Sequence, residues 1–189
     1  FRKLDDCQYI LFYTDINKLN TFRDNLVISS ENGYVTNPDF VNLRFNIYYS
    51  EETAFDTITG ENAIINRLKN INRSQSDRFA KAGFENDVQV DDFIINLKKF
   101  VKNDSVLEIS NTISYPLNLT INKKKKQISD PKSLVNEYTN IFNKKVKNAI
   151  LNQPIADVKV SVKGIIIGNG EILINRVEDK ICITSINTQ

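Results

Sequence analysis

Residues 91–102 read DDFIINLKKFVK, residues 113–121 ISYPLNLTI, residues 131–153 PKSLVNEYTNIFNKKVKNAILNQ and residues 164–172 GIIIGNGEI. The first and third segments space their apolar residues as a helix does, and the second alternates them as a strand does. The fourth has an Asn-Gly pair that suits a tight hairpin turn. Helix, strand, helix and hairpin in this order predict an α+β domain.

Short signals mark the ends of these helices. Asp91 and Asp92 suit the positive end of a helix dipole, and Asp130 followed by Pro131 is a typical helix start. Pro154 ends the helix of residues 131–153.

Further strands are predicted from alternation on both sides of the hairpin. We expect residues 158–167 to form one strand that leads into the turn, and residues 180–186 to form the last strand.

The first half of the chain has shorter patterns. Residues 8–14 are typical of a strand, residues 15–26 of a short helix, and residues 41–49 of a strand with one buried face. Residues 61–71 have the spacing of an amphipathic helix, with apolar positions at Ile64, Ile65, Leu68 and Ile71.

A polar stretch over residues 72–89 is the best boundary between the halves. We therefore predict two domains: an N-terminal α+β region of unrecognised fold over residues 1–88, and a second domain over residues 89–189.

Composition is that of an ordinary globular protein, with 41% hydrophobic and 25% charged residues. No apolar run approaches the roughly 18–20 residues that span a bilayer. A formal charge of +2 is too small to indicate a nucleic acid or an anionic membrane as partner.

The charge is unevenly distributed along the chain: the first 90 residues are net negative and the rest are net positive. Either the halves attract each other, or the second attracts anions, or the charge is only solvated surface.

The 189 residues include no His and no Met. Without His there can be no His-based triad, and the commonest metal ligand is missing. The two cysteines are too far apart in sequence for a CxxC motif, so neither zinc nor thioredoxin-like chemistry is indicated. We expect no metal and no cofactor.

The first residue is Phe1 instead of Met. This suggests that a signal peptide was removed or that the chain was trimmed.

Cys7 and Cys182 lie near opposite ends of the chain. They either form one disulfide, which suits an oxidising compartment, or remain separate buried thiols.

Acid–base chemistry without His requires a carboxylate with a raised pKa in an apolar pocket. Glu171 is the best candidate, because aliphatic residues flank its hairpin; Glu108 and Glu137 follow. Alternatively, Glu171 is an exposed carboxylate at the edge of the hairpin and has no catalytic role.

Three aromatic residues, Tyr115, Tyr138 and Phe142, could line a ligand pocket together with Glu171, or belong to the core. The four lysines of residues 123–126 could bind an acidic partner or lipid headgroups, or form a solvated turn.

Three segments carry a family resemblance: SYPLN (114–118), the helix through EYTNIF (137–142) and residues 145–150, and GIIIGNGEI (164–172). They resemble bacterial exported proteins of the nuclear-transport-factor-two-like superfamily. The resemblance spans about residues 90–185. It departs at Leu173, where an aromatic residue is expected, and in the length of the lysine run.

This resemblance implies a cystatin-like cone, in which a curved antiparallel sheet packs on helices and leaves a pocket at its open end. Members of the superfamily include enzymes, small-molecule binders and interaction modules, so the fold does not decide the function.

We therefore expect an exported protein, periplasmic or secreted, that binds a protein partner or a small apolar ligand without catalysis. One alternative is an enzyme of the isomerase or dehydratase type with Glu171 as base. Another is a self-associating envelope component such as a dimer.

Overall fold

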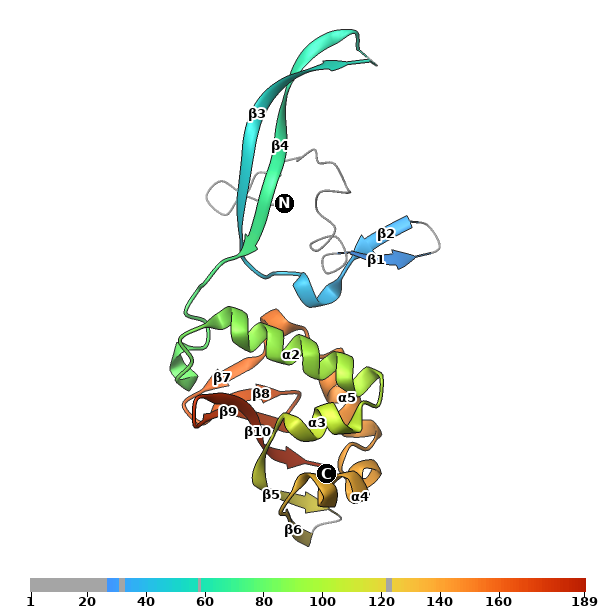
Figure 1. The fold of residues 1–189 in the computed structure, drawn as a ribbon, viewed down its shortest axis with the longest axis vertical. Coiled ribbons are helices and arrows are strands. Elements are labelled where there is room, and N and C mark those ends of the chain that lie inside the picture. Colours follow the sequence, from blue (N-terminus) through green and yellow to red (C-terminus); the bar gives the residue numbers. More distant parts are fainter. Residues whose placement is uncertain (1–26, 31–32, 58, 122–123) are drawn as a thin grey trace. The chain divides into compact units, whose positions relative to one another are not determined.

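The computed structural model describes residues 27–30, 33–57, 59–121 and 124–189. The chain divides into two compact units, Phe1–Ser74 and Gln75–Gln189 (Figure 1). The division after Ser74 lies within the polar stretch 72–89 that the sequence indicated as the boundary, although the limit predicted after residue 88 falls inside helix α2 (Asp87–Lys102). The strand predicted at residues 8–14 and the helix predicted at 15–26 lie outside the described residues.

The described residues of the first unit form two antiparallel strand pairs. Strand β1 (Val27–Ser30) pairs with β2 (Gly33–Thr36), and a 3-10 helix, η2 (Pro38–Phe40), follows. The Asn37 side chain starts η2 by accepting the Asp39 N–H at 3.0 Å. The predicted strand at 41–49 therefore begins later than expected, at Phe45.

The second pair of the first unit is a long hairpin of β3 (Phe45–Asp56) and β4 (Glu61–Arg73). The helix predicted at residues 61–71 is wrong, because this segment is β4. A bulge explains the error. Tyr48 pairs with Asn70 and Tyr49 with Leu68, which leaves Lys69 as the extra residue. The bulge brings Leu68 and Ile71 to one face of a strand although they are three positions apart.

The second unit is built on a mixed six-stranded sheet in the order β6-β5-β10-β9-β8-β7. Only β5 and β10 run parallel; the other neighbours are antiparallel. The strands are β5 (Ile113–Ile121), β6 (Lys124–Ile128), β7 (Lys159–Ser161), β8 (Gly164–Ile167), β9 (Ile172–Val177) and β10 (Lys180–Asn187).

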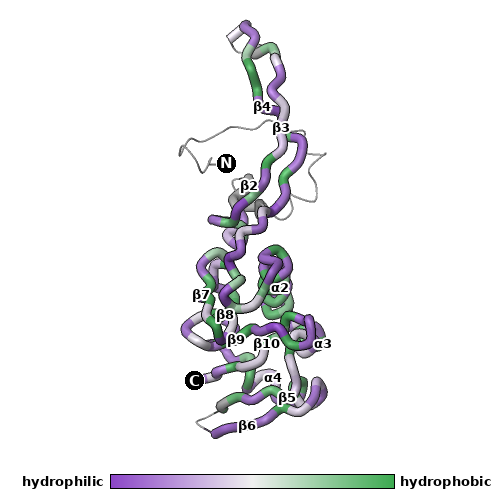
Figure 2. Tube along the Cα trace, turned by 90° about the vertical axis from the view of Figure 1, so that its left-hand side faces the viewer, coloured by the Kyte–Doolittle hydropathy of each residue, from purple (hydrophilic) through white to green (hydrophobic). Residues whose placement is uncertain are grey.

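Helices cover one face of this sheet (Figures 1 and 2). They are α2, α3 (Val106–Asn111), α4 (Pro131–Ile141) and α5 (Lys144–Asn152), with short 3-10 turns at Ala80–Ala82 and Ile155–Asp157. The core between helices and sheet is aliphatic and aromatic; its largest fully buried side chains include Phe79, Ile94, Leu97, Ile109, Leu117, Ile128, Leu134, Ile141, Phe142 and Ile150. The predicted α+β class, with a curved sheet packed on helices, is confirmed. The sheet was predicted to be antiparallel, but it is mixed, because β10 pairs with β5 in parallel.

Two elements of the second unit are divided where the sequence predicted continuity. Residues 131–153 form α4 and α5 instead of one helix, because the Asn143 side chain accepts the Val146 N–H at 3.1 Å and starts a new helix. Residues 158–167 form β7 and β8 instead of one strand. Val162 lies in the turn between them and is 79% exposed.

Three other predictions of the second unit are confirmed. Helix α2 begins four residues before the predicted start, where Asn86 caps it by accepting the Gln89 N–H. Strand β5 covers the predicted residues, and the Gly168-Asn169-Gly170 segment does turn β8 into β9. Among the described residues, no helix has both the length and the apolar character needed to cross a membrane.

Candidate functional site

Tyr138 and Phe142 lie at the end of α4 and stack on each other, with ring centroids 5.2 Å apart. Both are buried, at 7% and 1% exposure. The Tyr138 hydroxyl donates a hydrogen bond to Asp104 Oδ1 at 2.8 Å, and the Lys147 ammonium pairs with the same oxygen. This cluster joins the loop after α2 to α4 and α5.

Burial raises the pKa of the Tyr138 phenol, and its hydrogen bond to Asp104 raises that pKa further. The bonds from Lys147 and Tyr138 lower the pKa of the Asp104 carboxyl. Tyr138 is therefore a neutral donor whose partner is already present in the protein, and this arrangement matches the core alternative more closely than a ligand pocket.

Tyr115 is half-buried at the start of β5, and its hydroxyl donates to the Ser110 carbonyl at 3.2 Å. Burial raises the pKa of this phenol to about 12, and the negative charge of Asp130 adds to the shift. Among the described residues, no hydrogen bond, ion pair or ring contact joins Tyr115 to Tyr138 or Phe142. The structure thus places the three aromatic candidates in two separate settings.

Glu171 is buried, at 6% exposure, directly after the turn between β8 and β9. Its Oε1 lies 3.0 Å from Lys145 Nζ on α5, and its Oε2 accepts the Asn169 N–H at 2.6 Å. A Cβ added at Gly168 would meet Oε2 at 2.3 Å, so the carboxylate fills the space that this glycine leaves.

Burial acts to raise the pKa of Glu171, but the bonds from Lys145 and the Asn169 N–H outweigh it and hold the pKa below its usual value. A general base of the predicted type needs a raised pKa. Glu171 is instead a charged group that ties the hairpin turn to α5.

The environments of the other ionisable candidates, Glu137, Glu108 and Cys182, are as follows. Glu137 pairs with Lys126 at 2.6 Å, and this bond lowers its pKa. Glu108 is exposed on α3. Burial raises the pKa of the half-buried Cys182 thiol on β10. Cys7 lies outside the described residues, so the disulfide stays a prediction.

A groove of about 580 Å³ lies across β6, β5 and β10. Its described lining residues come from these three strands: Asn118, Leu119, Lys125, Lys126, Gln127, Ser185, Ile186 and Asn187. We call it the strand groove. It contains two lysines of the predicted run and none of the residues Tyr115, Tyr138, Phe142 or Glu171.

The β3–β4 hairpin of the first unit has one apolar face. Paired strand residues share a face, and so do residues two apart on one strand. The pairings Phe45–Arg73, Ile47–Ile71, Tyr49–Leu68, Glu51–Asn66, Thr53–Ile64 and Phe55–Asn62 therefore define one side of the hairpin. We call this side the apolar hairpin face; its large apolar residues are Phe45, Ile47, Tyr49, Phe55, Ile64, Leu68 and Ile71.

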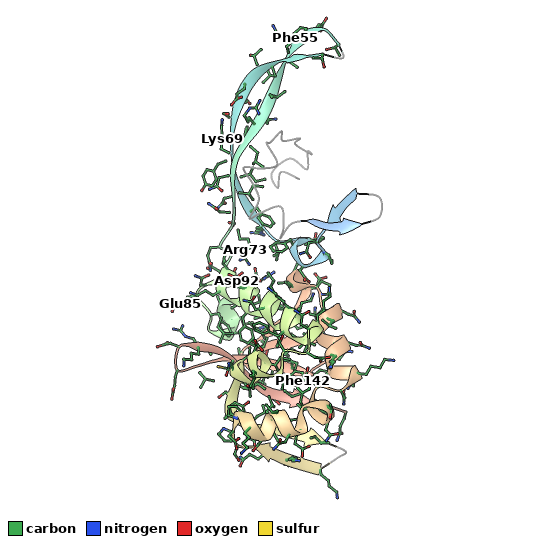
Figure 3. All side chains as sticks on the ribbon, turned by 45° about the vertical axis from the view of Figure 1, so that its right-hand side comes forward. Phe55, Lys69, Arg73, Glu85, Asp92 and Phe142 are labelled. Atoms are coloured by element: carbon green, nitrogen blue, oxygen red, sulfur yellow. The ribbon has the colours of Figure 1, made fainter. Side chains whose placement is uncertain are left out.

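Burial along the apolar hairpin face changes from one end to the other. Near the base Ile71 is 2% and Leu68 8% exposed. Toward the turn Ile64 is 75% and Phe55 64% exposed. Figure 3 shows Phe55 at the end of the hairpin far from Arg73. The turn half of this face thus presents large apolar side chains to solvent.

The opposite side of the hairpin carries an ion-pair cluster. Glu52 accepts from Lys69 Nζ at 2.9 Å, from Arg67 Nε at 2.5 Å and from the Ser50 hydroxyl at 2.8 Å. These bonds, with that of Lys69 the largest cause, lower the pKa of the Glu52 carboxyl to about 2. The hairpin is therefore amphipathic, although Glu51 and Arg73 lie on the apolar hairpin face and Tyr48 and Ile65 lie on the opposite side.

Neither surface was identified from sequence. The apolar hairpin face was hidden because its spacing indicated a helix. The strand groove is lined by residues near 118, 126 and 186, which only the strand order brings together.

Comparison of the chain with family models, curated proteins and solved structures gives no match. The superfamily resemblance and the export it implies stay predictions.

Proposed function

We propose that this is a non-enzymatic binding protein whose apolar hairpin face is the docking surface for a partner protein. The observation that carries the proposal is the exposure of Phe55 and Ile64 on the same side of one hairpin. Single exposed apolar residues are ordinary on protein surfaces, whereas large neighbouring ones mark interaction sites.

The register supports a shared contact surface. Phe55 pairs with Asn62, and Ile64 is two residues farther along β4, so the two side chains are diagonal neighbours within reach of each other. A two-stranded hairpin alone is only marginally stable in water and gains from packing against another element. Covering one such side chain contributes about 1.5–3 kcal/mol.

The state of Glu171 supports the non-enzymatic part of the proposal. Its charge is stabilised by Lys145 and the Asn169 N–H, which opposes the proton uptake that a general base requires. Binding through the hairpin needs no such group.

Site-specific photo-crosslinking tests the proposal in the cells that naturally produce the protein. A photoreactive benzoylphenylalanine is placed either at position 55, on the apolar hairpin face, or at position 54, on the opposite side. We expect a crosslinked protein adduct from position 55 and much less from position 54. Equal adducts from both positions, or none from either, would overturn the proposal.

A further inference from the structure

We propose that the strand groove of the second unit binds a small anionic molecule that carries hydroxyl groups, such as a sugar acid or a sugar phosphate. This site is independent of the apolar hairpin face, which belongs to the other unit. The inference rests on which side of the sheet the groove opens, on the chemistry of its side chains and on its size.

The groove opens on the side of the sheet that faces away from the helices. Lys126 pairs with Glu137 of α4, which places the Lys126 side chain on the helical side. Strand alternation then puts the neighbouring Lys125 and Gln127 on the other side. Leu119 is 5% and Ile186 1% exposed, so their side chains also lie on the core side, and their backbone forms the floor of the groove.

Register brings the outward side chains of three strands into two rows. Gln127 pairs with Asn118, and Asn118 with Ser185, which forms one row across β6, β5 and β10. Lys125 and Asn187 both pair with residue 120, which sets them at opposite ends of the next row. The ammonium group of Lys125, the amides of Asn118, Gln127 and Asn187, and the hydroxyl of Ser185 thus surround one depression.

Among the described residues, the lining contains hydrogen-bond donors and two lysines but no carboxylate. Asn118 Oδ1 accepts from Gln127 Nε2 at 3.2 Å, which orients both amides and leaves the Asn118 Nδ2 and Gln127 Oε1 atoms for a ligand. Lys125 has no ion-pair partner among the described residues, in contrast to Lys126. The groove therefore attracts a negative charge at Lys125 and offers amides and the Ser185 hydroxyl to ligand hydroxyls.

The volume of the groove, about 580 Å³, lies within the range of small-molecule sites, roughly 300–1,000 Å³. Its open form and the exposure of Lys125 imply weak binding, because water screens an exposed charge. The negative charge of the ligand can come from a carboxylate, as in a sugar acid, or from a phosphate, as in a sugar phosphate.

Amide NMR titration of the whole protein tests the site with glucuronate, glucose 6-phosphate and glucose as probes. We expect saturable shifts at Asn118, Gln127 and Asn187 with one or both anions, and weaker effects with neutral glucose. Added salt should reduce the affinity. Which anion binds more tightly identifies the source of the charge.

Two charge-matched variants complete the test. Lys125→Ala should weaken anion binding about fivefold, as expected for one exposed charged contact. Lys163→Ala removes the same charge from the exposed turn between β7 and β8 and should change nothing. The proposal is overturned if neither anion produces saturable shifts, if glucose binds as well as the anions, or if both variants bind like the wild type.

Discussion

The carboxylate of Glu171 lies 3.0 Å from the ammonium group of Lys145, and this contact fastens the turn between β8 and β9 to helix α5. The second carboxylate oxygen accepts the Asn169 N–H of the same turn. A residue that the sequence suggested as a base is thus a structural carboxylate, and its effect should be measurable as stability.

Glu171→Gln should lower the free energy of unfolding by about 1–2 kcal/mol at neutral pH, because it removes a charged, buried partner. The pKa of Glu171 is lower in the folded protein than the ordinary 4.5. Its stabilisation is therefore present above pH 4.5 and is lost as the pH falls through the folded-state pKa. Urea unfolding at neutral and acid pH measures both effects.

Glu108→Gln is the control for this prediction, because Glu108 is exposed on α3. It should leave stability unchanged. A Glu171→Gln protein as stable as the wild type at neutral pH would contradict the structural assignment, and so would a difference that persists undiminished in acid.

Asn143→Ala should destabilise the protein by about 1 kcal/mol, the usual cost of losing an N-cap. Asn143 caps α5, and its side-chain amide also donates to the Thr188 carbonyl at 3.2 Å. Asn140→Ala, on the exposed surface of α4, is the matched control and should have little effect. Thermal unfolding distinguishes them, and equal stability of the two variants would show that the break between α4 and α5 does not depend on this cap.

Gly164→Ala should be much more destabilising than Gly83→Ala. Both glycines have positive φ, +127° and +81°, so both variants are strained. At Gly164 the new Cβ would also lie 2.5 Å from the Ile174 carbonyl oxygen, whereas Gly83 faces open space. We expect a loss of more than about 2 kcal/mol at Gly164 and roughly 1 kcal/mol at Gly83. Equal losses in urea unfolding would mean that β8 and β9 are not packed this closely.

Glu52 should titrate with a pKa of about 2, well below its ordinary 4.5, as followed by NMR of its carboxyl carbon. Lys69→Gln and Arg67→Gln should each move this pKa toward 4.5, with Lys69→Gln having the larger effect. Lys159→Gln, in the other unit, should not change it. An ordinary pKa for Glu52 in the wild type would contradict the ion-pair cluster with Lys69 and Arg67.

Local patterns predicted much of the second unit. The alternation through Leu117 and Leu119 predicted β5, the periodicity through Ile94 and Leu97 predicted α2, and the Gly168-Asn169-Gly170 segment predicted the hairpin. These elements follow from contacts that each segment makes with one core, which is why their own sequences were sufficient.

Other features depend on residues that are distant in sequence. The bulge at Lys69 gave β4 the spacing of a helix, and only its pairing with β3 reveals the strand. The burial of Glu171 depends on Lys145, which lies on another element. The strand groove depends on the parallel pairing of β5 with β10, for which the sequence carries no local signal.

Native mass spectrometry of the protein from the cells that produce it tests the docking role of the apolar hairpin face most directly. Ile64→Arg charges this face, and Ala63→Arg places the same charge on the neighbouring, exposed residue of the opposite side. We predict a bound polypeptide on the wild type and on Ala63→Arg, with its occupancy reduced at least about tenfold on Ile64→Arg. Bare monomer in all three spectra, or the same complex on Ile64→Arg as on Ala63→Arg, would contradict the account.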